Sequence, residues 1–396
     1  MGQNTMHTMT IDENELLNLV QQMIRIDSVN PSLSDTGNGE SRIAHYLGEY
    51  LEKMGVEVAY QHMDSTRANV IGILRGSGEG KTIMLNGHTD TVSMERMDID
   101  PLDPKFEDGK VYGRGALDMK GGLAAKIIAV KSIIESGMKL KGDVILAFVA
   151  DEEYASLGTE TLLKEYSADA AIISEPTDLN ITIAHKGFAW TQVDVFGKAA
   201  HGSLPDKGID AIVKAGKFLV EIGNLEKTVL NQIRHPLLGS PSIHASLING
   251  GIELSTYPDH CNMKLERRTL PGENSETVKA EIKDIIDELS RDDKQFRASY
   301  EVFFYRPALE VSRDLPIVET LHKACKGVLK KEPKFVGSSG WLDSALLAES
   351  GIPTVIFGPR GEGLHGPVEY VDFDSVVTTT QILIHTIIDF CGIIRD

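Results

Sequence analysis

Four apolar runs in this sequence end in residues that can bind a metal ion or move a proton. Each run is short and rich in Val, Ile, Leu or Ala, which is typical of a buried strand. Because ligands collect beyond the carboxyl ends of strands in α/β sheets, we expect the polar residues to meet at one edge. The runs and these residues are 82–86 with His88 and Asp90, 144–150 with Glu152 and Glu153, 170–174 with Glu175, and 353–358 with His365.

A further carboxylate, Asp118, lies in the glycine-rich stretch GRGALDMKGG. Glycine-rich backbone lets a side chain approach a bound ion closely. Histidine and carboxylate without thiolate is a ligand set for catalytic zinc, or for cobalt or manganese at the same site. Two ions need a ligand with two usable oxygens to bridge them, which a carboxylate supplies. A Glu next to a ligand Glu can then act as the base.

Each of these features has an ordinary interpretation when it is taken alone. A His-x-Asp pair is more often structural, Glu152-Glu153 is typical of a helix start, and Glu175-Pro176 marks a turn. His365 among glycines resembles any exposed histidine. The prediction of a metal site rests on the joint occurrence of these residues at strand ends of one domain.

The elements around these residues indicate an α/β fold with a mixed or parallel sheet. Apolar residues recur at helical spacing over 12–24 and 40–54, and another helix opens at Gly121. From about residue 186 the pattern changes to that of a small α+β domain, with two helices on one face of a sheet, and the α/β pattern returns after Tyr305. We therefore expect a smaller domain inserted into a larger one, with boundaries at 186–303 for the insertion and 1–185 and 304–396 for the larger domain.

The composition of the chain limits which binding partners and which cellular compartment we expect for the protein. The chain has 396 residues and a formal charge of −18, and so acidic a surface repels nucleic acid. No apolar run approaches the roughly 20 residues that cross a bilayer, and the start, MGQNTMHTMT, lacks the features of a signal peptide. The cysteines are few, widely separated and odd in number, which argues against disulfides and fits a cytoplasmic protein; they are Cys261, Cys325 and Cys391.

The motifs GHTDTV, GRGALDMKGG, ADEE, SEP and LHGPVEY resemble those of the co-catalytic zinc hydrolases. That family includes acetylornithine deacetylase, succinyl-diaminopimelate desuccinylase, aminoacylase and glutamate carboxypeptidase. The likeness spans nearly the whole chain, in the family's order. It implies a zinc-peptidase-like catalytic domain with two zinc ions and an inserted lid domain through which the chain forms a homodimer. It also implies hydrolysis of the amide bond of a small N-acylated amino acid or short peptide.

The resemblance implies a role for each residue of the expected metal site. In it, Asp118 bridges the two ions, Glu152 is the general base, and Asp90 orients a histidine ligand, which fixes the tautomer of the imidazole. The peptide bond after the bridging Asp is cis in the family, which implies a cis bond between Asp118 and Met119. The remaining ligands form two pairs, His88 with Glu175 on one ion and Glu153 with His365 on the other.

The resemblance also implies substrate contacts. GKAAHGSLP resembles a lid motif whose histidine, here His201, stabilises the oxyanion, often across the dimer. In LERRTLPGE the residue expected to hold the substrate carboxylate is Arg268, while Arg267 on the same strand faces the other way. Two departures concern the substrate pocket, because Ser255 stands where the family's lid usually has Asn, and Arg360 stands where many relatives have Gly.

Two alternatives remain open from the sequence. One is a di- or tripeptide exopeptidase that uses the same metal core. The other, from a different class, is a catalytically idle binding protein that kept the fold. An idle relative is expected to lose the base or the bridge, but Glu152 and Asp118 are both present.

Overall fold

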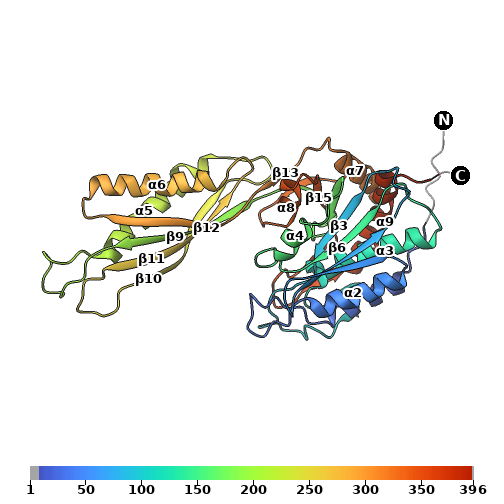
Figure 1. Cartoon of the computed structure of the whole chain (residues 1–396), viewed down its shortest axis with the longest axis horizontal. Coiled ribbons are helices and arrows are strands. Elements are labelled where there is room, and N and C mark those ends of the chain that lie inside the picture. Colours follow the sequence, from blue (N-terminus) through green and yellow to red (C-terminus); the bar gives the residue numbers. More distant parts are fainter. Residues whose placement is uncertain (1–8, 395–396) are drawn as a thin grey trace. The chain divides into compact units, whose positions relative to one another are not determined.

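The computed structural model describes residues 9–394. Most of the N-terminal segment MGQNTMHTMT, for which the sequence predicts no signal peptide, lies outside the described residues. The described chain divides into two compact units, each with its own sheet (Figure 1). The first unit comprises the described residues of Met1–Ile183, Val311–Val336 and Leu346–Asp396. The second comprises Ala184–Glu310 and Gly337–Ala345.

A nine-stranded sheet has the order β1-β2-β6-β3-β7-β15-β8-β13, with β14 also paired to β8. Strands β6, β3, β7 and β15 are parallel to one another, whereas β1, β2, β8 and β13 pair antiparallel. The expected mixed α/β sheet is therefore confirmed. Its strands are β1 (Glu57–His62), β2 (Ala68–Leu74), β3 (Ile83–His88), β6 (Val144–Val149), β7 (Ala170–Ile173), β8 (Ile181–His185), β13 (Leu309–Glu310), β14 (Phe335–Ser338) and β15 (Thr354–Ile356).

The helices of the first unit bury apolar faces against this sheet and against each other. The side chain of Asp12 caps the first helix by accepting a hydrogen bond from the amide of Glu15, and the second helix ends just before Gly55 at φ 81°. Helix α3 packs on α9 and α9 on α7, while α2 packs on β1 and β2. These helices are α1 (Glu13–Ile24), α2 (Ser41–Lys53), α3 (Gly121–Glu135), α4 (Leu157–Leu162), α7 (Pro316–Leu329), α8 (Ser344–Glu349) and α9 (Phe373–Cys391).

A separate four-stranded sheet, which the sequence did not reveal, has the order β16-β17-β5-β4. It joins the chain just before Asp118 to the chain around His365, because β5 pairs with β17. Its strands are β4 (Lys105–Glu107), β5 (Lys110–Tyr112), β16 (Gly361–Glu362) and β17 (Tyr370–Asp372).

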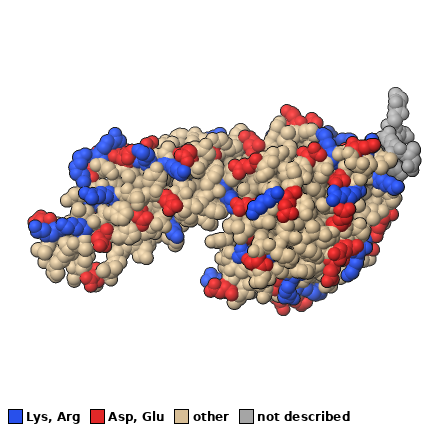
Figure 2. Space-filling model, in the orientation of Figure 1, with Lys and Arg blue, Asp and Glu red and all other residues tan. Residues whose placement is uncertain are grey.

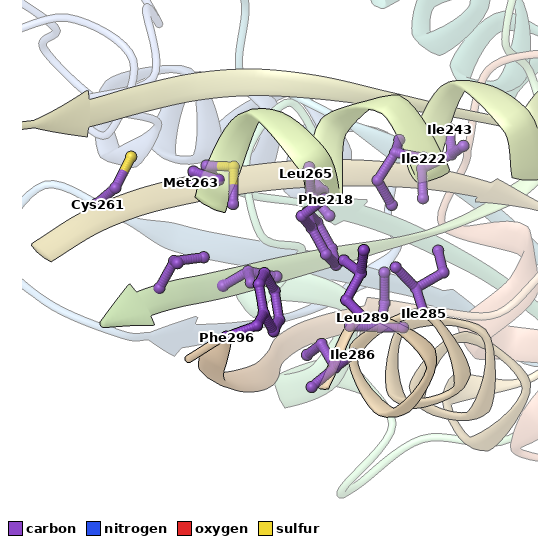
Figure 3. Packing of buried hydrophobic residues seen from close by; sticks show 14 of the residues in the cluster. Phe218, Ile222, Ile243, Cys261, Met263, Leu265, Ile285, Ile286, Leu289 and Phe296 are labelled. Carbon is purple, nitrogen blue, oxygen red and sulfur yellow. The ribbon is translucent and has the colours of Figure 1, made fainter. Parts of the chain in front are cut away.

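The second unit is a four-stranded antiparallel sheet, β10-β11-β9-β12, with two helices packed on it. Apolar side chains alternate along β9 and β11 and meet those of the helices in one core, where Phe218 lies among Leu265, Ile285 and Leu289 (Figure 3). A capping box at Asn274 and Thr277 fixes the start of the second helix. The elements are β9 (Gly187–Phe196), α5 (Ala211–Thr228), the short η2 (Leu230–Gln232), β10 (Ser242–Gly250), β11 (His260–Thr269), α6 (Ser275–Asp292) and β12 (Arg297–Arg306).

Acidic and basic side chains are interspersed on the face of the molecule in Figure 2. Within residues 9–394, every helix is too short or too polar to cross a membrane.

One histidine of the second unit is held neutral by the fold. His185 is fully buried, its Nδ1 lies 2.9 Å from the carbonyl oxygen of Lys186, and its Nε2 lies 2.8 Å from Oγ of Ser344. Burial lowers the pKa of His185 to about 4. Because the unfolded imidazole takes up a proton near pH 6.5, the unfolded state binds more protons than the folded state between about pH 6.5 and pH 4.

The unfolding free energy of this unit is therefore expected to fall by about 3 kcal/mol between pH 7 and pH 4 through His185 alone. Both tryptophans, Trp190 and Trp341, belong to the second unit, so urea unfolding followed by tryptophan fluorescence reports on it. His185→Gln is expected to flatten the pH dependence, and His62→Gln, at an exposed position, is the control. Equal slopes for wild type and His185→Gln would contradict this account.

Candidate metal centre

The parallel strands of the large sheet bring the predicted ligands to one edge. His88 is the last residue of β3 and lies beside Val149 at the end of β6, and β7 and β15 run in the same direction alongside. The loops after β6 and β7 carry Glu153 and Glu175, whereas His365, at φ 56°, lies in the turn between β16 (Gly361–Glu362) and β17 (Tyr370–Asp372). The structure brings these four residues together in two groups that share Asp118.

Asp118 reaches the same place from a short irregular segment, η1 (Ala116–Lys120), which directly precedes α3. Gly115 before it has φ 79°, a conformation that glycine adopts without steric cost. Asp118 and Met119 have non-helical backbone angles, and the peptide bond between them is cis, as the resemblance implies.

Two groups of ligand atoms share the Asp118 carboxylate. Nε2 of His88 lies 3.0 Å from Oδ1 of Asp118 and 3.4 Å from Oε1 of Glu175. Nε2 of His365 lies 3.3 Å from Oδ2 of Asp118 and 3.2 Å from Oε2 of Glu153. One oxygen of Asp118 therefore faces each group. This arrangement is the one that a carboxylate bridging two ions requires.

The donor set and its spacing fit divalent cations. Tetrahedral ligands at bond lengths of about 2.0–2.2 Å lie roughly 3.4 Å from one another. The four separations between histidine nitrogens and carboxylate oxygens run from 3.0 to 3.4 Å, and all ligand atoms of a group lie within 4.8 Å of one another. Nitrogen and oxygen donors of this kind suit zinc, cobalt or manganese.

The electrostatics of the centre also favour positive charge. Burial and repulsion from Asp118 raise the pKa of Glu175 and of Glu153. Hydrogen bonds to Asp118 and Glu153 raise the pKa of His365 to about 10. Burial disfavours the charged form of His88, but the neighbouring carboxylates raise the pKa of His88 well above its ordinary value. Three carboxylates thus share one confined space, where their charges repel each other unless a cation lies between them.

Asp90 connects His88 to the Glu152-Glu153 pair. Nδ1 of His88 lies 2.9 Å from the carbonyl oxygen of Asp90 and 3.5 Å from its Oδ1, so the closer contact is to the main chain rather than to the carboxylate. A proton on Nδ1 leaves Nε2 able to bind a metal. The Asp90 carboxylate accepts hydrogen bonds from the amides of Glu152 (3.2 Å) and Glu153 (3.1 Å). Glu152 belongs to neither group of ligand atoms.

Behind Asp90 lies a polar network that sequence reasoning missed. Nδ2 of Asn30 donates to Asp90 (2.8 Å) and to Asp151 (3.0 Å), and Nη1 of Arg67 donates to Asp151 (3.3 Å). Asp151 has φ 68°, and its amide donates to Glu40. Burial and repulsion from Asp90 raise the pKa of Glu40 to about 8. The only signal in the sequence is that Asp151 directly precedes Glu152.

His201 and Ser255 lie together in the second unit. Both are exposed, and the amide of Gly202 donates to the carbonyl oxygen of Ser255 at 2.7 Å. The amide of Ser203 donates to Nδ1 of His201 at 3.2 Å. Because Nδ1 accepts this hydrogen bond, the proton of the neutral ring is on Nε2, which makes His201 a hydrogen-bond donor.

The two neighbouring arginines of β11 face opposite sides of the sheet, as expected. Arg267 is fully buried and forms ion pairs with Glu273 and Glu281. Arg268 is partly exposed, lies over the ring of Phe188 at 5.2 Å and pairs with Glu266 at 2.6 Å. Arg268 is thus the member of the pair that is accessible to a ligand.

Arg360, the other predicted substrate contact, lies in the first unit after β15. Its guanidinium pairs with Oδ2 of Asp372 at 2.8 Å and is half exposed. This ion pair ties it to the start of α9. Its role in substrate binding stays a prediction.

Comparison with known proteins places the chain in a family. Residues 84–389 match the family model described as Peptidase family M20/M25/M40. The chain belongs to this family, and it is an enzyme of the metallopeptidase and amidohydrolase class, as its residues predict.

Two relatives in sequence cover nearly the whole chain. It is 29% identical over 409 residues to N-formyl-4-amino-5-aminomethyl-2-methylpyrimidine deformylase of Bacillus subtilis, with 96% of this chain and 95% of that protein covered. It is 30% identical over 372 residues to acetylornithine deacetylase of Myxococcus xanthus, with 92% and 93% covered.

Solved structures share the fold. Aminopeptidase PepT of Bacillus cereus matches with a TM-score of 0.79 at 22% identity, covering 96% of this chain and 100% of that one. YXEP of Bacillus subtilis, described as a dinuclear metal-binding peptidase of the M20 family, matches with a TM-score of 0.73 at 18% identity, covering 96% and 98%.

Proposed function

We propose that this enzyme hydrolyses the amide bond of N-acylated amino acids or closely related small N-acyl amines, with two zinc ions bound at the centre. Cobalt and manganese are expected substitutes. The observation that carries the proposal is the position of Asp118, whose two oxygens face two separate groups of ligand atoms. Two sequence relatives that cover most of the chain are a deacetylase and a deformylase, which supports removal of a small acyl group.

We assign His88 and Glu175 to one ion, Glu153 and His365 to the other, and Asp118 to both. When bound, a metal pair held by these residues would lower the pKa of a water molecule and polarise the carbonyl of the scissile amide.

Glu152 is suited to the proton transfers of this reaction. The amide of Glu152 donates a hydrogen bond to Asp90, which fixes its backbone. Glu152 is the neighbour in sequence of the ligand residue Glu153, but it belongs to neither group of ligand atoms. The carboxylate accepts a proton from the attacking water and returns it to the nitrogen of the leaving amine. The C–N bond breaks, and the products are a carboxylate and an amine.

The second unit supplies the remaining groups of the proposal. His201, with its proton on Nε2, donates a hydrogen bond to the developing oxyanion. Arg268 binds the substrate carboxylate, for which a guanidinium offers a fork of donors. Ser255 is adjacent to the His201 loop and contributes to the selection of the acyl group.

A homodimer formed through the second unit is part of the proposal. Strand β10 is an edge of its sheet, with exposed Leu247 and Ile248, and the neighbouring helix α5 exposes Val213 and Val220. The free hydrogen-bonding groups of an edge strand and an exposed apolar helix face both favour association with another surface. In a two-fold symmetric dimer, β10 and α5 of one subunit would meet the same β10 and α5 of the other.

A substrate panel tests the proposal. N-acetyl, N-formyl, N-succinyl and N-carbamoyl amino acids are compared with di- and tripeptides, in the presence of zinc, cobalt or manganese. We expect kcat/KM for the best N-acyl amino acid to exceed that for the best peptide at least tenfold. Faster cleavage of peptides would assign the enzyme to the exopeptidases. Bound metal without hydrolysis of any substrate would favour an idle binding protein.

A further inference from the structure

We propose that Glu369 and Arg114 are positioning residues that hold the loops of Asp118 and His365 together and thereby set how tightly the metal pair is bound. The inference rests on the proposed function, because it concerns the same centre. It adds a pair of residues that belongs to neither group of ligand atoms.

The carboxylate of Glu369 is buried and fully used by the Asp118 loop. Its Oε1 accepts hydrogen bonds from the amides of Leu117 (2.9 Å) and Asp118 (3.1 Å). Its Oε2 accepts from the amide of Gly115 (3.0 Å) and from Nη1 of Arg114 (2.8 Å). Four donors converge on one side chain that lies more than 250 residues away in the sequence.

This carboxylate satisfies amides that have no partner within a helix. The first amides of a helical segment lack a carbonyl acceptor inside it, and those of Gly115, Leu117 and Asp118 lie at the start of η1. Glu369 satisfies three of them, including that of the bridging residue itself. Charge-assisted hydrogen bonds of this kind are shorter and stronger than neutral ones, so they fix the backbone from which the Asp118 carboxylate extends.

Arg114 extends the connection to the loop of His365. Its Nη2 donates to the carbonyl oxygen of Gly366 at 3.3 Å, while its Nη1 holds Glu369. The amide of Gly113 donates to the carbonyl oxygen of Glu369 at 3.1 Å, which adds a main-chain tie between the same segments. Gly366 is the residue after His365, so the buried ion pair connects the backbone of the bridging carboxylate directly to the backbone of that ligand.

A merely structural ion pair would affect folding but not the affinity for metal. A positioning pair, in contrast, changes metal affinity even where the fold is intact, because ligand atoms that are misplaced bind less tightly. Metal affinity is therefore the decisive readout, and it can be measured without any substrate.

The test uses Glu369→Gln and Arg114→Lys in the full chain, with zinc competition against a chromogenic chelator as the measurement. In Glu369→Gln, the side-chain NH2 group replaces an oxygen that accepts hydrogen bonds, so it faces N–H donors and two of these hydrogen bonds are lost. At least one zinc ion is therefore expected to bind about 10–100-fold more weakly. Arg114→Lys keeps the charge beside Glu369 but loses the forked contact to Gly366, so a smaller loss, of several-fold, is expected. Glu362→Gln, an exposed position on the neighbouring strand β16, is the matched control.

Hydrolysis measured against free zinc gives a second readout. Glu369→Gln is expected to recover kcat as zinc is raised, with an unchanged KM, whereas the wild type is already saturated. Wild-type zinc affinity at both sites in the two variants, confirmed as folded by circular dichroism, would overturn the inference. If Glu369→Gln does not fold, Arg114→Lys decides alone. If the wild type does not bind two zinc ions, the proposed function fails, and the inference fails with it.

Discussion

Glu152→Gln is expected to lower kcat by about 10²–10⁴-fold while the protein still binds two metal ions. The amide has nearly the same shape as the carboxylate but cannot accept the proton of the attacking water. Since Glu152 lies outside both groups of ligand atoms, its loss leaves the five ligand residues in place.

Metal analysis of the purified variant and steady-state kinetics on the best substrate of the panel are the two measurements. Glu165→Gln, an exposed position in the same unit, serves as the control and is expected to match the wild type. Loss of a metal ion in Glu152→Gln would make Glu152 a ligand. Unchanged kcat would remove it from the proton transfers.

His201→Ala is expected to lower kcat by about 10²–10³-fold, the usual effect of removing one donor to an oxyanion. Folding and metal content are expected to stay at the wild-type level, because His201 is exposed and lies in the second unit, outside the metal centre. His260→Ala, another exposed histidine of that unit, is the control. Full activity in His201→Ala would contradict the assignment.

Mixing His201→Ala with Glu152→Gln shows in which subunit His201 acts. In a mixed dimer, one centre can combine an intact Glu152 with an intact His201 of the partner. Recovery of activity therefore means that His201 acts across subunits. No recovery, with subunit exchange demonstrated by co-purification of differently tagged chains, means that it acts within one chain.

The ligand positions were predictable because the signal is local. Each of β3, β6, β7 and β15 is a short apolar run, and the first polar residues beyond it must leave the sheet at the same edge when the strands are parallel. The sequence therefore predicted that His88, Glu153 and Glu175 come together. The cis bond after Asp118 followed from the resemblance alone.

The hydrogen bonds that support the ligand residues could not be predicted, because they join residues far apart in the sequence. Asn30 lies 60 residues from Asp90 and 121 residues from Asp151 in the sequence, and it is one of several polar residues in the stretch 27–41. Nothing in the local pattern distinguishes such a residue from an exposed one. Strands β4, β5, β16 and β17 are similarly hidden, because two or three residues are too few to show a period.

Titration of the metal-free protein with zinc tests the central claim most directly. Hydrolysis of the best N-acyl amino acid is followed as zinc is added in fractions of an equivalent. If Asp118 bridges two ions, activity is predicted to rise and to reach its plateau at two zinc ions per chain. Full activity without metal, or a plateau at one equivalent, would contradict the two-ion centre.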